Sequence, residues 1–139
     1  FGNALGAQVV KAIESAVPAG KERLAFNALT VPLPLADGKR SVPLALHRLD
    51  LAEDVALMGL GGDVCVDFGL FVKALRPGKT TLPVGYTNGS ISYICPERYF
   101  AEGGYESCDS WQYFGLSGPL SPASDKVVRQ GLQDIMQAR

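Results

Sequence analysis

Two short apolar runs and the segment between them limit the folds open to this chain. Residues 55–60 form a wholly apolar run that ends at Gly61-Gly62, as expected of a strand buried on both faces. The next segment has apolar residues at helical spacing and stops at Arg76-Pro77-Gly78. Its apolar stripe consists of Val64, Phe68, Phe71, Val72 and Leu75. A second apolar strand covers 81–86, so we expect a right-handed crossover unit in a sheet with a parallel portion.

The residues before this unit are expected to extend the sheet. Residues 24–35 and 42–51 flank Asp37-Gly38, a strong signal for a tight turn, and therefore predict a hairpin. Because proline cannot donate a backbone hydrogen bond, three prolines argue against a central position for the hairpin. They are Pro32, Pro34 and Pro43.

Helices are predicted at both ends of the chain. The first ends before Pro18 and is expected to cover the sheet with an apolar face of Leu5, Val9, Ile13 and Val17. Ser124 or Asp125 can cap the last helix. Its inward residues are Val127, Val128, Leu132, Ile135 and Met136. The predicted fold class is α/β, a mixed β-sheet with flanking helices, in a single segment over 1–139 that no linker divides.

Composition excludes several classes of function. A chain of 139 residues with 47% hydrophobic content is enough for one domain with a core. Thirteen Lys plus Arg stand against fourteen Asp plus Glu, a balance without the basic excess that binds phosphates or anionic membranes. No apolar run approaches the ~18 residues that span a bilayer. We therefore expect neither nucleic-acid binding nor a transmembrane segment. Because the chain starts at Phe1 within a helical pattern, we expect it to be part of a longer protein.

The three cysteines give no metal-binding or disulfide framework. Cys65, Cys95 and Cys108 include no CxxC pair, so neither a zinc knuckle nor a disulfide-rich scaffold fits. Buried free thiols are one interpretation. A single Cys95–Cys108 bridge in an oxidising compartment is the other, and the sequence leaves both open.

Functional residues are expected where the predicted strands end, because α/β sheets usually bind ligands beyond the carboxyl ends of their strands. Asp63 and the loop rich in glycine and tyrosine after Tyr86 both lie there. A purely structural interpretation makes Asp63 a cap of the following helix. The corresponding interpretation of the tyrosines is a packed ring with a solvated hydroxyl. These tyrosines are Tyr86, Tyr93, Tyr99, Tyr105 and Tyr113.

Two segments carry a resemblance to a known family, VALMGLGGDVCVDFGLFVKAL and TLPVGYTNGSISYICPERYFAEGGYES. Their order, spacing and composition are similar to the late part of the catalytic domain in neutral/alkaline, non-lysosomal ceramidases and their bacterial relatives. The similarity covers nearly the whole chain, since Gly2-Asn3-Ala4-Leu5-Gly6 resembles a helix that precedes this region. The resemblance implies a zinc-dependent amidohydrolase that cleaves the N-acyl amide bond of ceramide or a related lipid amide.

The resemblance also implies roles for three residues. The carboxylate that binds zinc falls on Asp63, where the family usually has glutamate in a Pro-Gly-Glu turn. The tyrosine that binds zinc falls on Tyr93, and the tyrosine that helps to stabilise the oxyanion falls on Tyr105. Aspartate is shorter by one methylene, so Asp63 reaches the metal only if the turn lies closer or a water intervenes.

The two histidine ligands of the family have no counterpart here. His47, the one histidine, lies in a predicted strand, matches no metal ligand and is expected to be structural. Because a catalytic zinc commonly needs three protein ligands, the chain is expected to be the C-terminal portion of a catalytic domain and inactive alone. A missing N-terminal part would supply the histidines, and the truncated sheet would favour self-association. The family implies a secreted or periplasmic location.

Two other hypotheses come from different classes of protein. A non-catalytic binding or scaffold domain of the same fold is supported by aspartate in place of glutamate at Asp63. A lipase-like serine hydrolase is not supported, because the chain has no GxSxG sequence.

Overall fold

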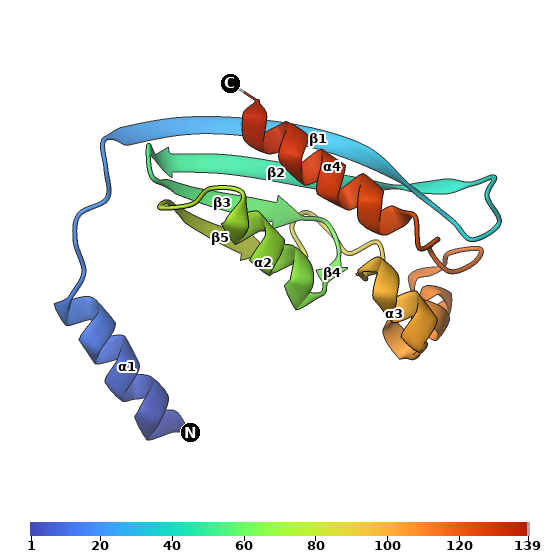
Figure 1. Cartoon of the computed structure of the whole chain (residues 1–139), viewed down its shortest axis with the longest axis horizontal. Helices are drawn as coiled ribbons and strands as arrows, with labels where there is room; N and C mark the ends of the chain where they lie inside the picture. Colours follow the sequence, from blue (N-terminus) through green and yellow to red (C-terminus); the bar gives the residue numbers. More distant parts are fainter. Residues whose placement is uncertain (139) are drawn as a thin grey trace.

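The computed structural model describes residues 1–138, which form a mixed four-stranded sheet with helices packed on it (Figure 1). The strands of this sheet, in spatial order, are β1 (Glu22–Pro34), β2 (Ser41–Ala52), β3 (Val55–Leu60) and β5 (Thr80–Val84). A second, two-stranded sheet consists of β4 (Asp63–Val64) and β6 (Tyr93–Ile94). The α-helices are α1 (Gly2–Glu14), α2 (Val66–Ala74), α3 (Glu97–Glu102) and α4 (Ser124–Gln137). The predicted class, α/β with a mixed sheet and flanking helices, is confirmed.

The predicted hairpin is β1 and β2, which pair antiparallel around the turn at Asp37-Gly38. Gly38 has a φ of 66°, a left-handed conformation that favours glycine. The Asp37 carboxylate accepts hydrogen bonds from the backbone N–H groups of Lys39 and Arg40 at 2.8 and 3.0 Å. The prolines are tolerated because β1 is an edge strand and β2 pairs with β3 only from Leu46 onward.

The predicted crossover is β3, α2 and β5, and β3 pairs parallel with β5 as expected. The helix of this unit begins at Val66, with Cys65 as its N-cap residue and Asp67 in its first turn. Asp63 therefore does not cap α2, because β4 comes between β3 and the helix. The structural interpretation of Asp63 as a helix cap is wrong.

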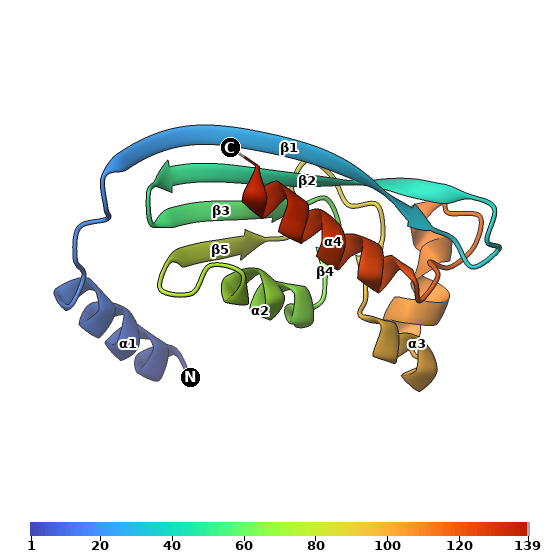
Figure 2. The same ribbon diagram turned by 45° about the horizontal axis from the view of Figure 1, so that its top comes forward.

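Helices α2 and α4 cover one face of the large sheet. Figure 2 shows α4 crossing β1 and β2, while α2 lies beside β5. Close approach of α4 depends on Gly131, where a Cβ would lie 2.7 Å from Val31 Cγ1. The buried residues from the sheet and the two helices include Leu44, Leu46, Met58, Leu60, Phe68, Val72, Val128, Leu132 and Ile135. These side chains form one core on this face.

The other face of the large sheet is exposed and apolar. One row across all four strands reads Phe26, Leu49, Leu57 and Leu82 by their pairing. Phe26 is 62% exposed and Leu82 is 46% exposed. The expectation that the strand at 55–60 is buried on both faces is therefore wrong. Its continuous apolar run has one buried face, while the other face leaves Val55 and Leu57 half-buried and is covered at Gly59 by the Thr87 side chain.

The first helix forms, but it ends at Glu14 and so excludes Val17 of the predicted apolar face, and it does not cover the sheet. Every residue of α1 is exposed, including the apolar residues Leu5, Val9 and Ile13. Figure 1 shows α1 beyond the end of the sheet, joined to β1 by an extended segment. The backbone N–H of Gly20 donates to Asp54 Oδ1 at 2.8 Å and fixes the end of that segment. An amphipathic pattern identifies the apolar face of a helix, but it does not identify the surface against which that face packs.

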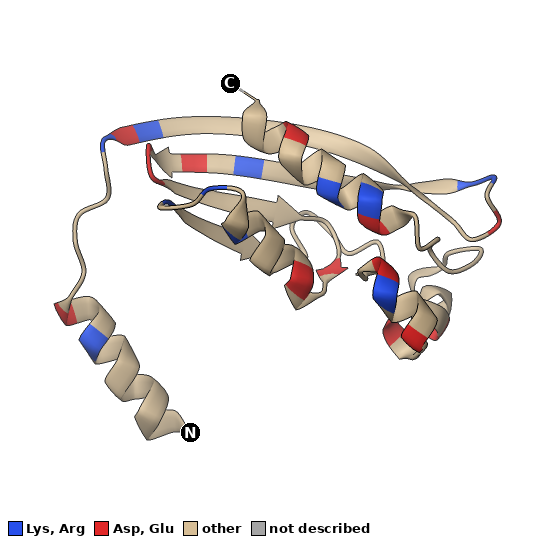
Figure 3. Ribbon diagram, viewed as in Figure 1, with Lys and Arg blue, Asp and Glu red and all other residues tan. Residues whose placement is uncertain are grey.

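Charges are sparse within the sheet. In Figure 3 the acidic and basic residues are interspersed over the helices, loops and strand ends, and β3 and β5 carry none. Arg48 and Asp50 are the charged residues of β2, and both side chains are buried. Among residues 1–138, no helix has the length and apolar character needed to cross a bilayer.

Candidate functional site

The small sheet brings Asp63 and Tyr93 together. These residues are far apart in sequence, but they are direct partners in the parallel pairing of β4 with β6. The backbone N–H of Asp63 donates to the carbonyl of Ser92 at 2.9 Å, and both Asp63 and Tyr93 are half-buried. Because paired residues of parallel strands direct their side chains to the same face, the carboxylate and the phenol share one side of this sheet.

The chain before β4 requires glycine for this pairing. A Cβ at Gly62 would lie 2.6 Å from Ile94 Cγ1 and 3.1 Å from the carbonyl oxygen of Ser92. Only glycine lets the turn after β3 lie this close to β6. The Gly61-Gly62-Asp63 turn therefore places the carboxylate next to the tyrosine loop.

Tyr105 is placed against Tyr93 by a turn of π-helix, η1 (Tyr105–Asp109). The Tyr93 and Tyr105 ring centroids are 5.8 Å apart and the rings meet edge to face at 74°. Gly103 and Gly104, with φ of 77° and 112°, turn the chain into η1. The structure thus brings together the three residues that the resemblance singled out.

Other aromatic residues surround this pair. The 3₁₀-helix η2 (Ser110–Phe114) supplies Phe114, which meets Tyr93 edge to face at 5.9 Å. Tyr113, also from η2, has its ring centroid 5.9 Å from that of Tyr105. The phenols of the cluster are reachable from solvent, since Tyr105 and Tyr113 are both exposed.

Tyr86 is a member of the site that the sequence analysis did not assign. Its backbone N–H donates to the carbonyl of Gly62 at 2.9 Å, which holds it beside the Asp63 turn. Hydrogen bonding to the Asp63 carboxylate raises the pKa of the Tyr86 phenol to about 12 and also raises the pKa of Tyr93. Tyr86 has a φ of 58°, a strained conformation for a residue other than glycine, and such strain clusters at functional sites.

Two cysteines lie next to the site. Cys65 and Cys95 directly follow the paired strands β4 and β6, and their Sγ atoms are 3.6 Å apart. Hydrogen bonding between the thiols lowers the pKa of Cys65 and raises that of Cys95. Cys108 contacts Ser107 Oγ at 3.5 Å, and all three cysteines are free.

His47 lies on the face of the large sheet opposite the core, in the same row as Gly59. It is half-buried, its ring stacks on Phe26 at 5.9 Å, and its Nε2 lies 3.3 Å from Asn88 Nδ2. Within residues 1–138, no group of three His, Cys, Asp or Glu side chains is placed to hold a metal.

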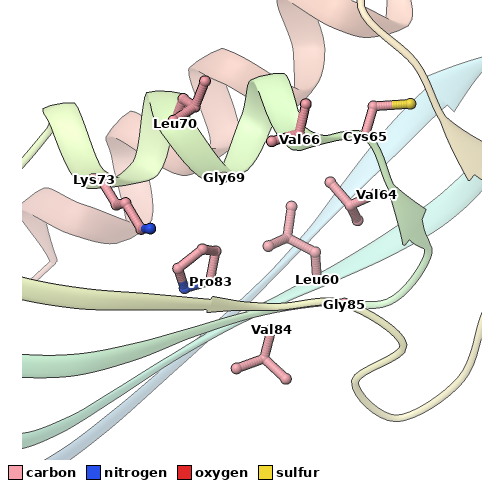
Figure 4. Close-up of a pocket in the computed structure, with 10 residues that line it drawn as sticks. All are labelled: Leu60, Val64, Cys65, Val66, Gly69, Leu70, Lys73, Pro83, Val84 and Gly85. Atoms are coloured by element: carbon pink, nitrogen blue, oxygen red, sulfur yellow. The ribbon is translucent and has the colours of Figure 1, made fainter. Parts of the chain in front are cut away.

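An apolar pocket of about 200 Å³ opens between α2 and the ends of β3 and β5 (Figure 4). Its lining is mainly apolar: Leu60, Val64, Cys65, Val66, Gly69, Leu70, Lys73, Pro83, Val84 and Gly85. Val64 lines it, and alternation along β4 directs the preceding Asp63 to the opposite side. The pocket is therefore separate from the carboxylate and tyrosine cluster.

Comparisons of the chain with protein families, with characterised proteins and with solved structures give no match.

The link between Asp63 and Tyr86 can be tested by titration. We expect the Tyr86 phenol to ionise near pH 12 in the wild-type chain, because ionisation would lose its hydrogen bond to the carboxylate. In Asp63→Asn it should ionise nearer the ordinary value of about 10. Because the folded-state pKa is the higher one, this bond stabilises the fold below pH ~10 and is lost as pH rises through the raised pKa.

The measurement is the ultraviolet absorbance of tyrosinate, with the Tyr86 component isolated by subtracting the titration of Tyr86→Phe. Asp67→Asn is the matched control, since Asp67 contacts Arg98 and Tyr99 instead. An unchanged Tyr86 component in Asp63→Asn would refute the link.

Proposed function

We propose that this chain is the C-terminal portion of the catalytic domain of a ceramidase-like, zinc-dependent amidohydrolase. The substrate class is ceramide or a related lipid amide, cleaved at the N-acyl bond. The supporting observation is the pairing of Asp63 with Tyr93 across β4 and β6, with the Tyr105 ring against Tyr93. These are the residues to which the family resemblance gives the carboxylate ligand, the tyrosine ligand and the oxyanion donor.

The donor set fits zinc in chemistry and is incomplete in number. Carboxylate oxygen is a normal zinc ligand, and Asp63 and Tyr93 are both partly open to solvent. Asp63 and Tyr93 would hold the ion together with two histidines from outside this chain. When bound, zinc would act as a Lewis acid toward the amide carbonyl and lower the pKa of water.

The remaining roles belong to residues of this chain. The exposed Tyr105 phenol would donate a hydrogen bond to the oxyanion that develops as the amide is attacked. Edge-to-face contact with Tyr93 would hold the Tyr105 ring in place, and Phe114 also packs edge to face with Tyr93. Tyr86, whose phenol pKa is raised by the Asp63 carboxylate, would keep that carboxylate oriented.

Amide hydrolysis by a longer polypeptide tests this function. We expect a protein that contains this chain and the preceding histidine-bearing part to release fatty acid from N-acylsphingosine, and a chelator to abolish that release. The 139-residue chain alone should show no release. No activity of the longer protein against a range of N-acyl amides, with zinc present, would contradict the proposal.

The exposed sheet face favours a second candidate, a non-catalytic binding or scaffold domain of the same fold. The row Phe26, Leu49, Leu57 and Leu82 is apolar and uncovered, as at surfaces that contact another protein. Self-association of the chain through this face and a secreted or periplasmic location both stay predictions. Zinc binding by the longer protein distinguishes the enzyme from the scaffold.

A further inference from the structure

We propose that Cys65 and Cys95 are a reversible dithiol–disulfide pair that links β4 to β6. Their Sγ atoms are 3.6 Å apart, and both residues are free cysteines. The backbone N–H of Cys65 donates to the carbonyl of Ile94 at 3.1 Å, which continues the parallel pairing one residue beyond β4. This pair does not depend on the amidohydrolase function proposed above.

The geometry needs little change to form the bond. A disulfide has an S–S distance of about 2.05 Å and typically joins residues whose Cα atoms are about 4.4–6.8 Å apart, as neighbouring strands place them. The sulfurs can close the remaining gap by rotation about the side chains, while the strand pairing holds the backbones. Among the described residues, Cys65 and Cys95 are the pair of cysteines whose sulfurs are in contact, and Cys108 Sγ contacts Ser107 Oγ.

Burial assigns different roles to the two thiols. Cys65 is half-buried at the start of α2, and Figure 4 shows its sulfur directed away from the pocket beside the helix. Cys95 is only 3% exposed. A small oxidant reaches Cys65 first, and Cys95 resolves the product from inside the protein.

The oxidant is a low-molecular-weight disulfide such as oxidised glutathione. The Cys65 thiolate attacks one of its sulfurs, forms a mixed disulfide and releases one small thiol. The Cys95 sulfur then attacks Cys65 Sγ, loses its proton and releases the second small thiol. Two protein thiols and one small disulfide become one protein disulfide and two small thiols, so both electrons go to the small molecule.

The bond would fix the two strands that carry Asp63 and Tyr93. Each of these residues lies two positions before one of the cysteines, on the same pair of strands. Oxidation would therefore prevent β4 and β6 from separating, and reduction would restore that freedom. The oxidised chain should accordingly unfold at a higher temperature than the reduced chain.

The test oxidises the reduced 139-residue chain with glutathione disulfide, quenches with acid, and measures intact mass and non-reduced peptide maps. We expect the wild-type chain and Cys108→Ser to lose two hydrogens and to yield a peptide pair joined through Cys65 and Cys95. Cys95→Ser should stop at one glutathione on Cys65, because no resolving thiol is present. The midpoint temperature of thermal unfolding should rise on oxidation in the wild type and in Cys108→Ser. It should not rise in Cys95→Ser.

Three results would overturn the proposal. They are a wild-type chain that keeps both thiols under oxidising glutathione, a bridge that maps to Cys95 and Cys108, and a Cys95→Ser chain that carries no glutathione on Cys65. The wild-type peptide map needs no substitution, so a variant that fails to fold does not obscure the answer.

Discussion

Asp50→Ala should lower the free energy of unfolding by about 3–5 kcal/mol, the largest stability effect that we expect from one substitution in this chain. Asp50 is 1% exposed, Arg48 Nε donates a hydrogen bond to its Oδ1 at 3.0 Å, and Arg48 Nη2 lies 2.8 Å from its Oδ2 in an ion pair. Arg76 Nη1 lies 3.8 Å from the same carboxylate. Removing the carboxylate would leave the buried Arg48 guanidinium and the half-buried Arg76 guanidinium without their anion, and uncompensated buried charge is costly.

The Asp50→Ala substitution should also weaken the attachment of the last helix, α4. Arg48 Nη1 donates to the carbonyl oxygens of Met136 and Ala138 at 2.7 and 3.2 Å, so the same arginine ties the end of α4 to β2. Urea unfolding followed by circular dichroism measures the effect. Arg40→Ala, which breaks an exposed ion pair with Asp37, is the control and should cost less than about 1 kcal/mol. Equal losses in the two variants would contradict the importance of the buried pair.

Under the proposed function, in which Tyr105 is the oxyanion donor, Tyr105→Phe in the longer protein should lower kcat for N-acyl amide hydrolysis by about 10²–10³-fold. Phenylalanine keeps the ring that meets Tyr93 at 5.8 Å and removes only the hydroxyl. The zinc content should therefore stay unchanged, because the substitution alters neither Asp63 nor Tyr93, the proposed metal ligands of this chain.

Tyr113→Phe is the matched control for this substitution. Tyr113 lies beside Tyr105 in the same aromatic cluster, but it is 79% exposed and has no assigned role. The kcat of the Tyr113→Phe variant should remain close to that of the wild type. A similar fall in both variants would show a general effect on the cluster, and no fall in Tyr105→Phe would remove Tyr105 from the reaction.

The large sheet could be predicted because local signals define it. The Asp37-Gly38 turn fixes the hairpin of β1 and β2, and apolar runs joined by a helical stripe define β3, α2 and β5. The position of α1 could not be predicted, because its apolar stripe is equally compatible with any apolar partner. The exposure of the second sheet face could not be predicted either. A continuous apolar run has the same sequence pattern whether one or both faces of the strand are buried.

The site was predictable only in part. Asp63 and the tyrosine loop were expected to lie close together, because each follows the carboxyl end of one of two adjacent predicted strands. The β4–β6 pairing is only two residues long on each strand and leaves no periodic signal, so the Cys65–Cys95 contact was not foreseen. One signal existed, because each cysteine follows its candidate ligand by two positions, as parallel register requires. Tyr86 was missed because its contact with Asp63 depends on a strained backbone that sequence patterns do not encode.

Zinc stoichiometry of the longer protein tests the central proposal most directly. Metal analysis after dialysis should give one zinc per chain for the wild type and a clear loss for both Asp63→Ala and Tyr93→Phe. Asp67→Ala is the control, since this nearby carboxylate pairs with Arg98 and should leave the zinc content unchanged. If Asp63→Ala and Tyr93→Phe both retain the zinc content of the wild type, the assignment of these residues as metal ligands is wrong.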